Sequence, residues 1–127
     1  MNENDVAKII VDAAFTIHKR LGPGLLESAY EVILLHELKK RGLSVLRQVL
    51  MPIMYDDINL TAGYRIDLLV ENLVVVELKS IEELHPVHKM QLFTYLKLSN
   101  KKLGLLINFN VPLIKDGISR VINGFIQ

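Results

Sequence analysis

Three ionisable residues in the middle of the chain, Asp67, Glu77 and Lys79, stand among residues that are mostly apolar. Glu77 and Lys79 alternate with Val76 and Leu78, so on a β-strand the two charges would lie on one face. Burying an unpaired carboxylate costs on the order of several kcal/mol, and two carboxylates held close together repel each other. A divalent cation bound between Asp67 and Glu77 would offset both costs.

This carboxylate pair predicts a magnesium-type site for phosphate chemistry. Mg²⁺ prefers oxygen ligands and keeps several of its waters when it serves phosphate chemistry in proteins. We expect Asp67 and Glu77 to be ligands of Mg²⁺, or of Mn²⁺ in its place, and the backbone carbonyl of Leu78 to be a further ligand. Lys79 could then position the attacking water or stabilise negative charge in the transition state.

The connection between the two strands provides an internal test of this site. A two-residue turn at 71–72 would pair Asp67 with Val76 and turn Glu77 to the opposite face of the sheet. A three-residue connection at 71–73 would pair Asp67 with Glu77 directly. The metal-site hypothesis therefore requires an odd-numbered loop or a bulge.

Glu27 is a further candidate ligand on an upstream helix. It lies seven residues before Leu34 and eleven before Leu38, so we expect its side chain to face inward and to be a possible metal ligand. The alternative is a carboxylate that favours the helix N-terminus, where glutamate is common. The two roles are compatible.

Gln91 and Tyr95 form a polar stripe on a downstream helix. They lie four residues apart and share a face, with His88 three residues before Gln91. Such a stripe could order water or bind a phosphate. For His88 itself, a structural role at the helix start is the more common one.

The hydrophobic pattern predicts an α/β (α+β) fold in the order α, α, β, β, β, α, β, followed by a short β tail. We expect Asn4 to cap the start of the first helix and Gly22-Pro23 to end it. Pro52 places the first strand at a sheet edge or a bulge, and Asp56-Asp57 is the expected turn after it. We predict helices over Val6–Leu21, Leu25–Arg41 and Pro86–Leu98, and strands over Val45–Tyr55, Gly63–Val70, Leu73–Lys79, Leu103–Phe109 and Ile118–Ile122.

Length and composition narrow the class of protein. With 127 residues, half of them apolar, residues 1–127 are expected to form one domain with a real core. The chain has no cysteine, which excludes disulfides, thiolate zinc sites and thiol nucleophiles. No apolar run is long enough to span a membrane and the start is too polar for a secretory signal, so we expect a cytoplasmic protein. The net charge of +1 argues mildly against a sequence-independent DNA coat.

Taken together, these residues resemble the PD-(D/E)XK nuclease superfamily over nearly the whole chain. The Q-x-x-x-Y pattern from Gln91 to Tyr95 is typical of its RecB-like branch. The stretch from Gly24 to Tyr30 is similar to the signature of the small bacterial and archaeal GxxExxY family. The superfamily proline before the aspartate is replaced here by Arg65-Ile66, a common departure. The residues that carry the resemblance are Asp67, Glu77-Leu78-Lys79, Gln91 to Tyr95, and Gly24-Leu25-Leu26-Glu27-Ser28-Ala29-Tyr30.

The resemblance implies a central mixed β-sheet flanked by helices, the restriction-endonuclease-like core. It further implies that Glu27, Asp67 and Glu77 surround the metal, that Lys79 serves catalysis, and that Gln91 and Tyr95 support the site.

We therefore expect a Mg²⁺-dependent nuclease that hydrolyses phosphodiester bonds in DNA through a metal-activated water. The alternative is a catalytically inactive module with the same fold that binds nucleic acid or a protein partner. A third hypothesis is a homo-oligomer formed through the first helix, which predicts an apolar surface patch around Ile9, Ile10 and Ile17.

Overall fold

A computed structural model describes residues 1–126. Its elements follow the expected order, with a short 3₁₀ helix before the last strand. The helices are α1 (Glu3–Leu21), α2 (Glu27–Lys40), α3 (Pro86–Ser99) and η1 (Ile114–Gly117), and the strands are β1 (Val45–Tyr55), β2 (Ile58–Val70), β3 (Val74–Lys79), β4 (Leu103–Asn108) and β5 (Ile118–Ile122).

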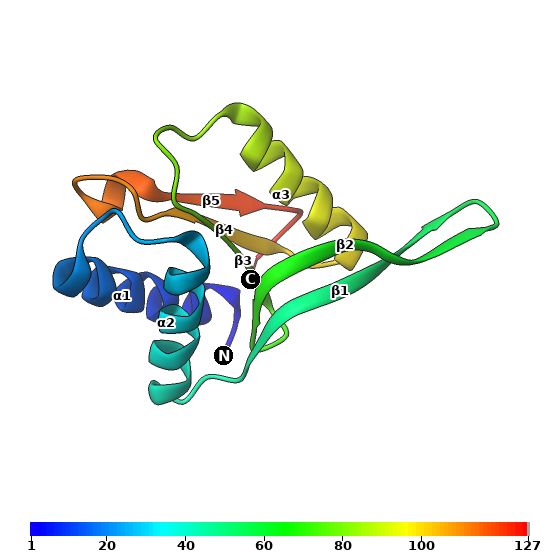
Figure 1. Cartoon of the computed structure of the whole chain (residues 1–127). Coiled ribbons are helices and arrows are strands. Elements are labelled where there is room, and N and C mark those ends of the chain that lie inside the picture. Colours follow the sequence, from blue (N-terminus) through cyan, green and yellow to red (C-terminus); the bar gives the residue numbers. More distant parts are fainter. Residues whose placement is uncertain (127) are drawn as a thin grey trace.

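The strands form one mixed sheet of five in the order β1-β2-β3-β4-β5. The β3 and β4 pair is parallel and the other pairs are antiparallel. The chain passes from β3 to β4 through α3, as parallel neighbours require. Helices α1 and α2 lie on one side of the sheet and α3 lies on the other (Figure 1). The α+β fold with helices flanking a mixed sheet is confirmed.

The core is divided by the sheet into two layers. The larger layer packs α1 and α2 against one face, and its fully buried side chains include Leu34, Leu38 and Leu78. The smaller layer packs α3 against the other face through Leu92 and Leu96. Strands β3 and β4 are almost entirely buried because helices cover both of their faces.

The first helix starts earlier than its sequence pattern suggests. Its N-cap is Asn2, whose side chain accepts a hydrogen bond from the backbone N–H of Asp5, while the Asp5 carboxylate accepts one from Asn2. The expected cap at Asn4 is therefore wrong, because the reciprocal capping box at Asn2 adds residues to the helix start. The end at Gly22 is confirmed.

The apolar patch expected on the first helix is not a surface feature. Ile10 is fully buried and Ile17 is 2% exposed, and Ile9 packs against the same core layer. These residues face α2 and the sheet, so their apolar area is already covered within the chain. The predicted surface patch at these residues is therefore wrong.

Strands β1 and β2 form a hairpin that extends well beyond the rest of the molecule (Figure 1). The register shifts between Met51 and Ile53, as expected for a proline at position 52 in an edge strand. Strand β2 starts at Ile58 rather than at Gly63, because Ile58, Asn59 and Leu60 also pair with β1. The apolar residues Ile58 and Leu60 alternate there with polar Asn59, a strand pattern that the expected start at Gly63 left out. The hairpin turn lies at Asp56-Asp57, as expected.

Among residues 1–126, no helix is long and apolar enough to cross a membrane.

Candidate active site

The connection between β2 and β3 is the three-residue loop that the site requires. It comprises residues 71–73, and Glu71 and Asn72 both adopt positive φ angles, 52° and 55°. The register pairs Leu68 with Val76, so the next position along the strands sets Asp67 opposite Glu77. The predicted register is confirmed.

Asp67 and Glu77 interact where β2 and β3 separate. The backbone N–H of Asp67 donates to Glu77 Oε1 at 3.3 Å, and the backbone N–H of Leu78 donates to Asp67 Oδ2 at 2.9 Å. The Asp67 carboxylate thus occupies the place where a β2 carbonyl would continue the sheet ladder. These two contacts bring the two carboxyl groups together at the point where the strands separate.

The environment of Glu77 strongly disfavours its charged form. Its side chain is 8% exposed, and burial, followed by repulsion from the Asp67 carboxylate, raises the pKa of Glu77 to about 9. The positive charge of Lys79 acts in the opposite direction but does not cancel these effects. Without a cation at this position, Glu77 is therefore protonated at neutral pH.

Lys79 lies at the end of β3, and the segment after it is fixed by a buried amide. Asn108, 1% exposed, stands opposite Lys79 on β4. Its side chain accepts a hydrogen bond from the backbone N–H of Ile81 at 3.1 Å and donates to the Ile81 carbonyl at 3.0 Å. This two-point contact holds the chain just beyond Lys79 and limits how β3 can move.

Helix α3 contributes Tyr95 to the surroundings of the carboxyl pair. The Tyr95 ring stacks on Tyr64 of β2, with ring centroids 4.6 Å apart. Partial burial, then the charges of Glu77 and Asp67, raises the pKa of the Tyr95 hydroxyl. Gln91 is one turn earlier and exposed.

His88 has a structural contact in this structure. Its Nδ1 accepts a hydrogen bond from the backbone N–H of His85 at 3.0 Å, as part of a capping box at the start of α3. The structural role weighed for His88 is supported by this contact.

Glu27 does not face inward as its spacing suggests. It is the first residue of α2 and is exposed, although Leu34 and Leu38 on the same line are fully buried. The reason is that a helical side chain covers the turn preceding its own position, and at the start of a helix there is no such turn. The expectation of an inward-facing Glu27 is wrong.

The loop just before Glu27 is nevertheless held against the end of β3. The Ser80 hydroxyl, next to Lys79, donates to the Leu25 carbonyl at 2.6 Å. The Tyr30 hydroxyl donates to the Gly22 carbonyl at 2.6 Å and accepts from the Leu25 N–H. The Tyr30 ring is buried and stacks on Phe109. Glu27 therefore belongs to the same end of the sheet as Lys79.

Two residues of this region were not identified from the sequence, Glu31 and Gln48. Glu31 is 5% exposed, and its carboxylate accepts hydrogen bonds from Arg47 and Gln48 of β1. The Gln48 amide also approaches Asp67 Oδ1 at 3.4 Å. Gln48 has a φ of 54°, in the left-handed region, within a strand. Such strain in a non-glycine residue is found mainly where the surroundings or function require it.

A signal for Glu31 was present in the sequence, but none for Gln48. Glu31 lies seven residues before Leu38, so the spacing argument applied to Glu27 places Glu31 on an inward line as well. Gln48 is exposed and lies in an edge strand. Its contact with Asp67 depends on a backbone conformation that no sequence pattern specifies.

The carboxyl pair is the part of this region whose chemistry suits a hard cation. Asp67 and Glu77 offer carboxylate oxygens side by side, and Mg²⁺ commonly binds one or two carboxylates while keeping several waters. Among the described residues, no three Asp, Glu, His or Cys side chains gather closely enough to hold a metal ion. Glu27 is thus not grouped with Asp67 and Glu77 in this structure.

The comparisons with known proteins agree with this geometry. The sequence profile of a family described as the PD-(D/E)XK nuclease superfamily matches residues 4–121. No curated protein and no solved structure matched the chain. Because the match covers nearly the whole length, the chain belongs to the PD-(D/E)XK nuclease superfamily.

Proposed function

We propose that this protein is a Mg²⁺-dependent nuclease that hydrolyses phosphodiester bonds in DNA. The observation that carries the proposal is the contact between Asp67 and Glu77 at the point where β2 and β3 separate, with Lys79 two residues further along β3. A structural ion pair would not explain it, because both contacting groups are acids and Glu77 is buried. A divalent cation held there would supply Lewis acidity toward water and the phosphate.

The chain's own residues would serve distinct roles around a phosphodiester. Asp67 and Glu77 would bind the cation, and the Leu78 carbonyl would add a ligand. Lys79 would place its ammonium group against the scissile phosphate and stabilise the charge that develops there. Mn²⁺ would substitute for Mg²⁺ because both prefer oxygen donors.

Three further residues would complete the site. Glu27 would approach the cation from the start of α2, next to the loop that Ser80 and Tyr30 hold at this end of the sheet. Tyr95 and Gln91, on α3, would orient the phosphate backbone of the nucleic acid. The Gly24 to Tyr30 stretch and the Gln91 to Tyr95 pair support assignment to the GxxExxY group within the superfamily.

The test combines metal binding with cleavage. Mg²⁺ and Mn²⁺ are titrated calorimetrically into the wild type and Asp67→Asn, and the same samples are incubated with linear and circular DNA. We expect binding and cleavage in the wild type and neither in Asp67→Asn. Asp57→Asn, an exposed aspartate at the hairpin turn, is the matched control and should retain both activities.

Lys79→Ala separates catalysis from metal binding. We expect the rate of cleavage to fall by about 10²- to 10³-fold while metal binding persists. Lys39→Ala, at an exposed lysine on α2, should change neither cleavage nor metal binding. Absence of metal binding in the wild type would rule out the catalytic proposal. DNA binding that is unchanged by Lys79→Ala, without cleavage under any metal, would favour a non-catalytic binding module.

A further inference from the structure

Strand β5 leaves one edge of the sheet unpaired. It is the last strand in the order, and among residues 1–126 no segment pairs with its outer side. An open strand edge presents backbone N–H and C=O groups that can accept another strand. What flanks this edge therefore decides what it could bind.

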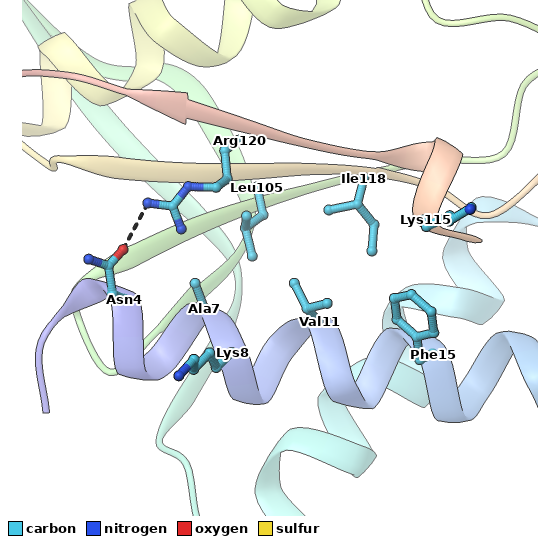
Figure 2. Close-up of a pocket in the computed structure, with 9 residues that line it drawn as sticks. All are labelled: Asn4, Ala7, Lys8, Val11, Phe15, Leu105, Lys115, Ile118 and Arg120. Atoms are coloured by element: carbon cyan, nitrogen blue, oxygen red, sulfur yellow. Dashed lines mark hydrogen bonds between the residues drawn. The ribbon is translucent and has the colours of Figure 1, made fainter. Parts of the chain in front are cut away.

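On one face, a groove runs between β5 and α1 (Figure 2). Its volume is about 560 Å³, and Val11 and Phe15 of α1 face Leu105 and Ile118 of the sheet across it. Phe15 is 45% exposed. Exposed apolar side chains on both walls of a groove are typical of a site that binds apolar groups of a partner.

On the other face, a second groove runs between β5 and α3. Its volume is about 540 Å³, and its apolar lining includes Met90, Phe93 and Val121. Met90 is 66% exposed and Phe93 is 37% exposed. The two helices thus present apolar side chains on both sides of the sheet at the same open edge.

The charges along these two grooves all have one sign. Arg120 of β5 lines both grooves, Lys8 and Lys115 line the first, and Lys89 and Lys97 line the second. Neither lining contains an aspartate or a glutamate. None of these five cations forms an ion pair within the described residues, and the Arg120 guanidinium donates a hydrogen bond to the neutral Asn4 side chain at 2.8 Å.

We propose that the β5 edge is a docking site for an extended, acidic and apolar segment of a partner protein, which would pair with β5 as a sixth strand. A strand added there would lie about 4.8 Å from β5, and its successive side chains would point alternately to the two faces of the sheet. Apolar side chains would enter the grooves beside α1 and α3, and carboxylates would meet the five cations. This inference is independent of the proposed nuclease activity.

Charge argues against a second copy of this chain at the same edge. Two β5 edges paired with each other would bring two Arg120 side chains, and the lysines around them, into one interface without carboxylates. Like charges placed across an interface oppose association. A nucleic-acid duplex also fits the apolar groove walls poorly, because it presents charged phosphates outward while its bases are stacked inside.

The test measures binding of a synthetic peptide by fluorescence anisotropy. The probe is a capped peptide of about eight residues, a common strand length, with valines at its centre and glutamates at both ends. One control peptide carries lysines in place of glutamates, and another has alternate backbone nitrogens methylated so that it cannot pair as a strand. We expect the acidic peptide alone to bind, with affinity that falls as salt increases.

Two charge reversals locate the binding site. Arg120→Glu and Lys115→Glu should each weaken binding by about tenfold, while Lys39→Glu, an exposed lysine on α2, should leave it unchanged. Amide NMR shifts on peptide addition should concentrate in β5 and in the flanks of α1 and α3. DNA cleavage gives a separate readout, so loss of the nuclease activity leaves this test intact.

Several outcomes would overturn the proposal. The first is that the acidic peptide does not bind at millimolar concentration. The second is that the methylated peptide binds as tightly as the acidic peptide. The third is that Lys39→Glu weakens peptide binding as much as Arg120→Glu does. A dimer through the β5 edge, detected by sedimentation and by NMR, would assign the edge to a second copy. Displacement of the peptide by a single-stranded oligonucleotide that shifts the same β5 amides would assign it to nucleic acid.

Discussion

At the scale of single residues, Glu77 holds a buried carboxyl group beside that of Asp67. Its pKa rises from the ordinary 4.5 to about 9, first because of burial and then because of Asp67. The folded protein therefore binds this proton more tightly than the unfolded chain does. The stabilisation that this bound proton gives to the folded state is fully present below pH 4.5 and is lost progressively as pH rises to about 9.

Glu77→Gln should remove this pH dependence from the metal-free protein. The glutamine amide has nearly the shape of the protonated acid and can still accept the Asp67 N–H, but it does not titrate. We expect the wild type to lose stability across the interval from 4.5 to about 9, and the variant to be more stable at the alkaline end by on the order of 1 to 3 kcal/mol. Urea unfolding in EDTA at a series of pH values measures both.

The matched control for this prediction is Glu82→Gln, since Glu82 is an exposed acid just after β3. This variant should follow the wild-type pH profile. A Glu77→Gln profile that runs parallel to the wild type at every pH would show that Glu77 does not hold a proton near neutrality.

Gln48 offers a second test at this scale, because its strain and its contacts can be separated. Gln48→Gly fits the positive φ of 54°, so we expect the free energy of unfolding to stay unchanged or to rise by up to about 1 kcal/mol. The variant also removes the amide that links Glu31 with Asp67. We therefore expect Mg²⁺ binding to weaken several-fold, measured by calorimetry.

Gln48→Glu is the complementary variant. It would place a third carboxylate between Glu31 and Asp67, and we expect lower stability in the metal-free protein because of repulsion. Unchanged Mg²⁺ affinity in Gln48→Gly would mean that this residue only accommodates the path of the strand.

At the scale of elements, the start of α2 is positioned by Tyr30 rather than by a helix cap. The N-cap residue, Leu26, makes no side-chain hydrogen bond. The Tyr30 hydroxyl instead contacts Gly22 and Leu25, and its ring stacks on Phe109 at a centroid distance of 4.3 Å. These contacts fix the loop between α1 and α2 against the end of the sheet.

Tyr30→Phe should keep the ring stack and lose the hydroxyl contacts. We expect the free energy of unfolding to fall by about 1 kcal/mol, measured by chemical denaturation. Mg²⁺ affinity should fall with it, because Glu27 directly follows the loop that loses these contacts. Tyr55→Phe, with Tyr55 68% exposed at the hairpin end, is the matched control. A loss of stability without any change in Mg²⁺ affinity would argue that Glu27 is not a ligand.

At the scale of the whole molecule, the candidate active site and the proposed docking edge at β5 lie on different parts of the sheet. The site lies where β2 and β3 separate, and the open edge is β5, with β4 between β3 and β5. A partner strand on β5 would therefore leave the Asp67 and Glu77 region uncovered. This separation follows from the strand order, in which β4 and β5 are added on the side of β3 that faces away from β2.

The sequence alone predicted the architecture because its elements are locally consistent. Amphipathic spacing, Gly22 at a helix end and Pro86 at a helix start specified the helices. The alternation around Asp67 and Glu77 required the three-residue loop that the structure contains. The expected start of β2 at Gly63 was too late, because the alternation of Ile58 and Leu60 with Asn59 is short and these residues are exposed. Only their pairing with β1 shows that they continue the strand.

What depended on tertiary structure was which side chains face the core and each other. Helical spacing placed Glu27 and Glu31 on equivalent inward lines, and only the start of α2 decided that Glu27 is exposed and Glu31 buried. The left-handed Gln48 and the five cations along the β5 edge come together from segments far apart in the chain. Local periodicity determines on which face of its own helix or strand a side chain lies. Which other side chains it contacts depends on how all the elements pack together.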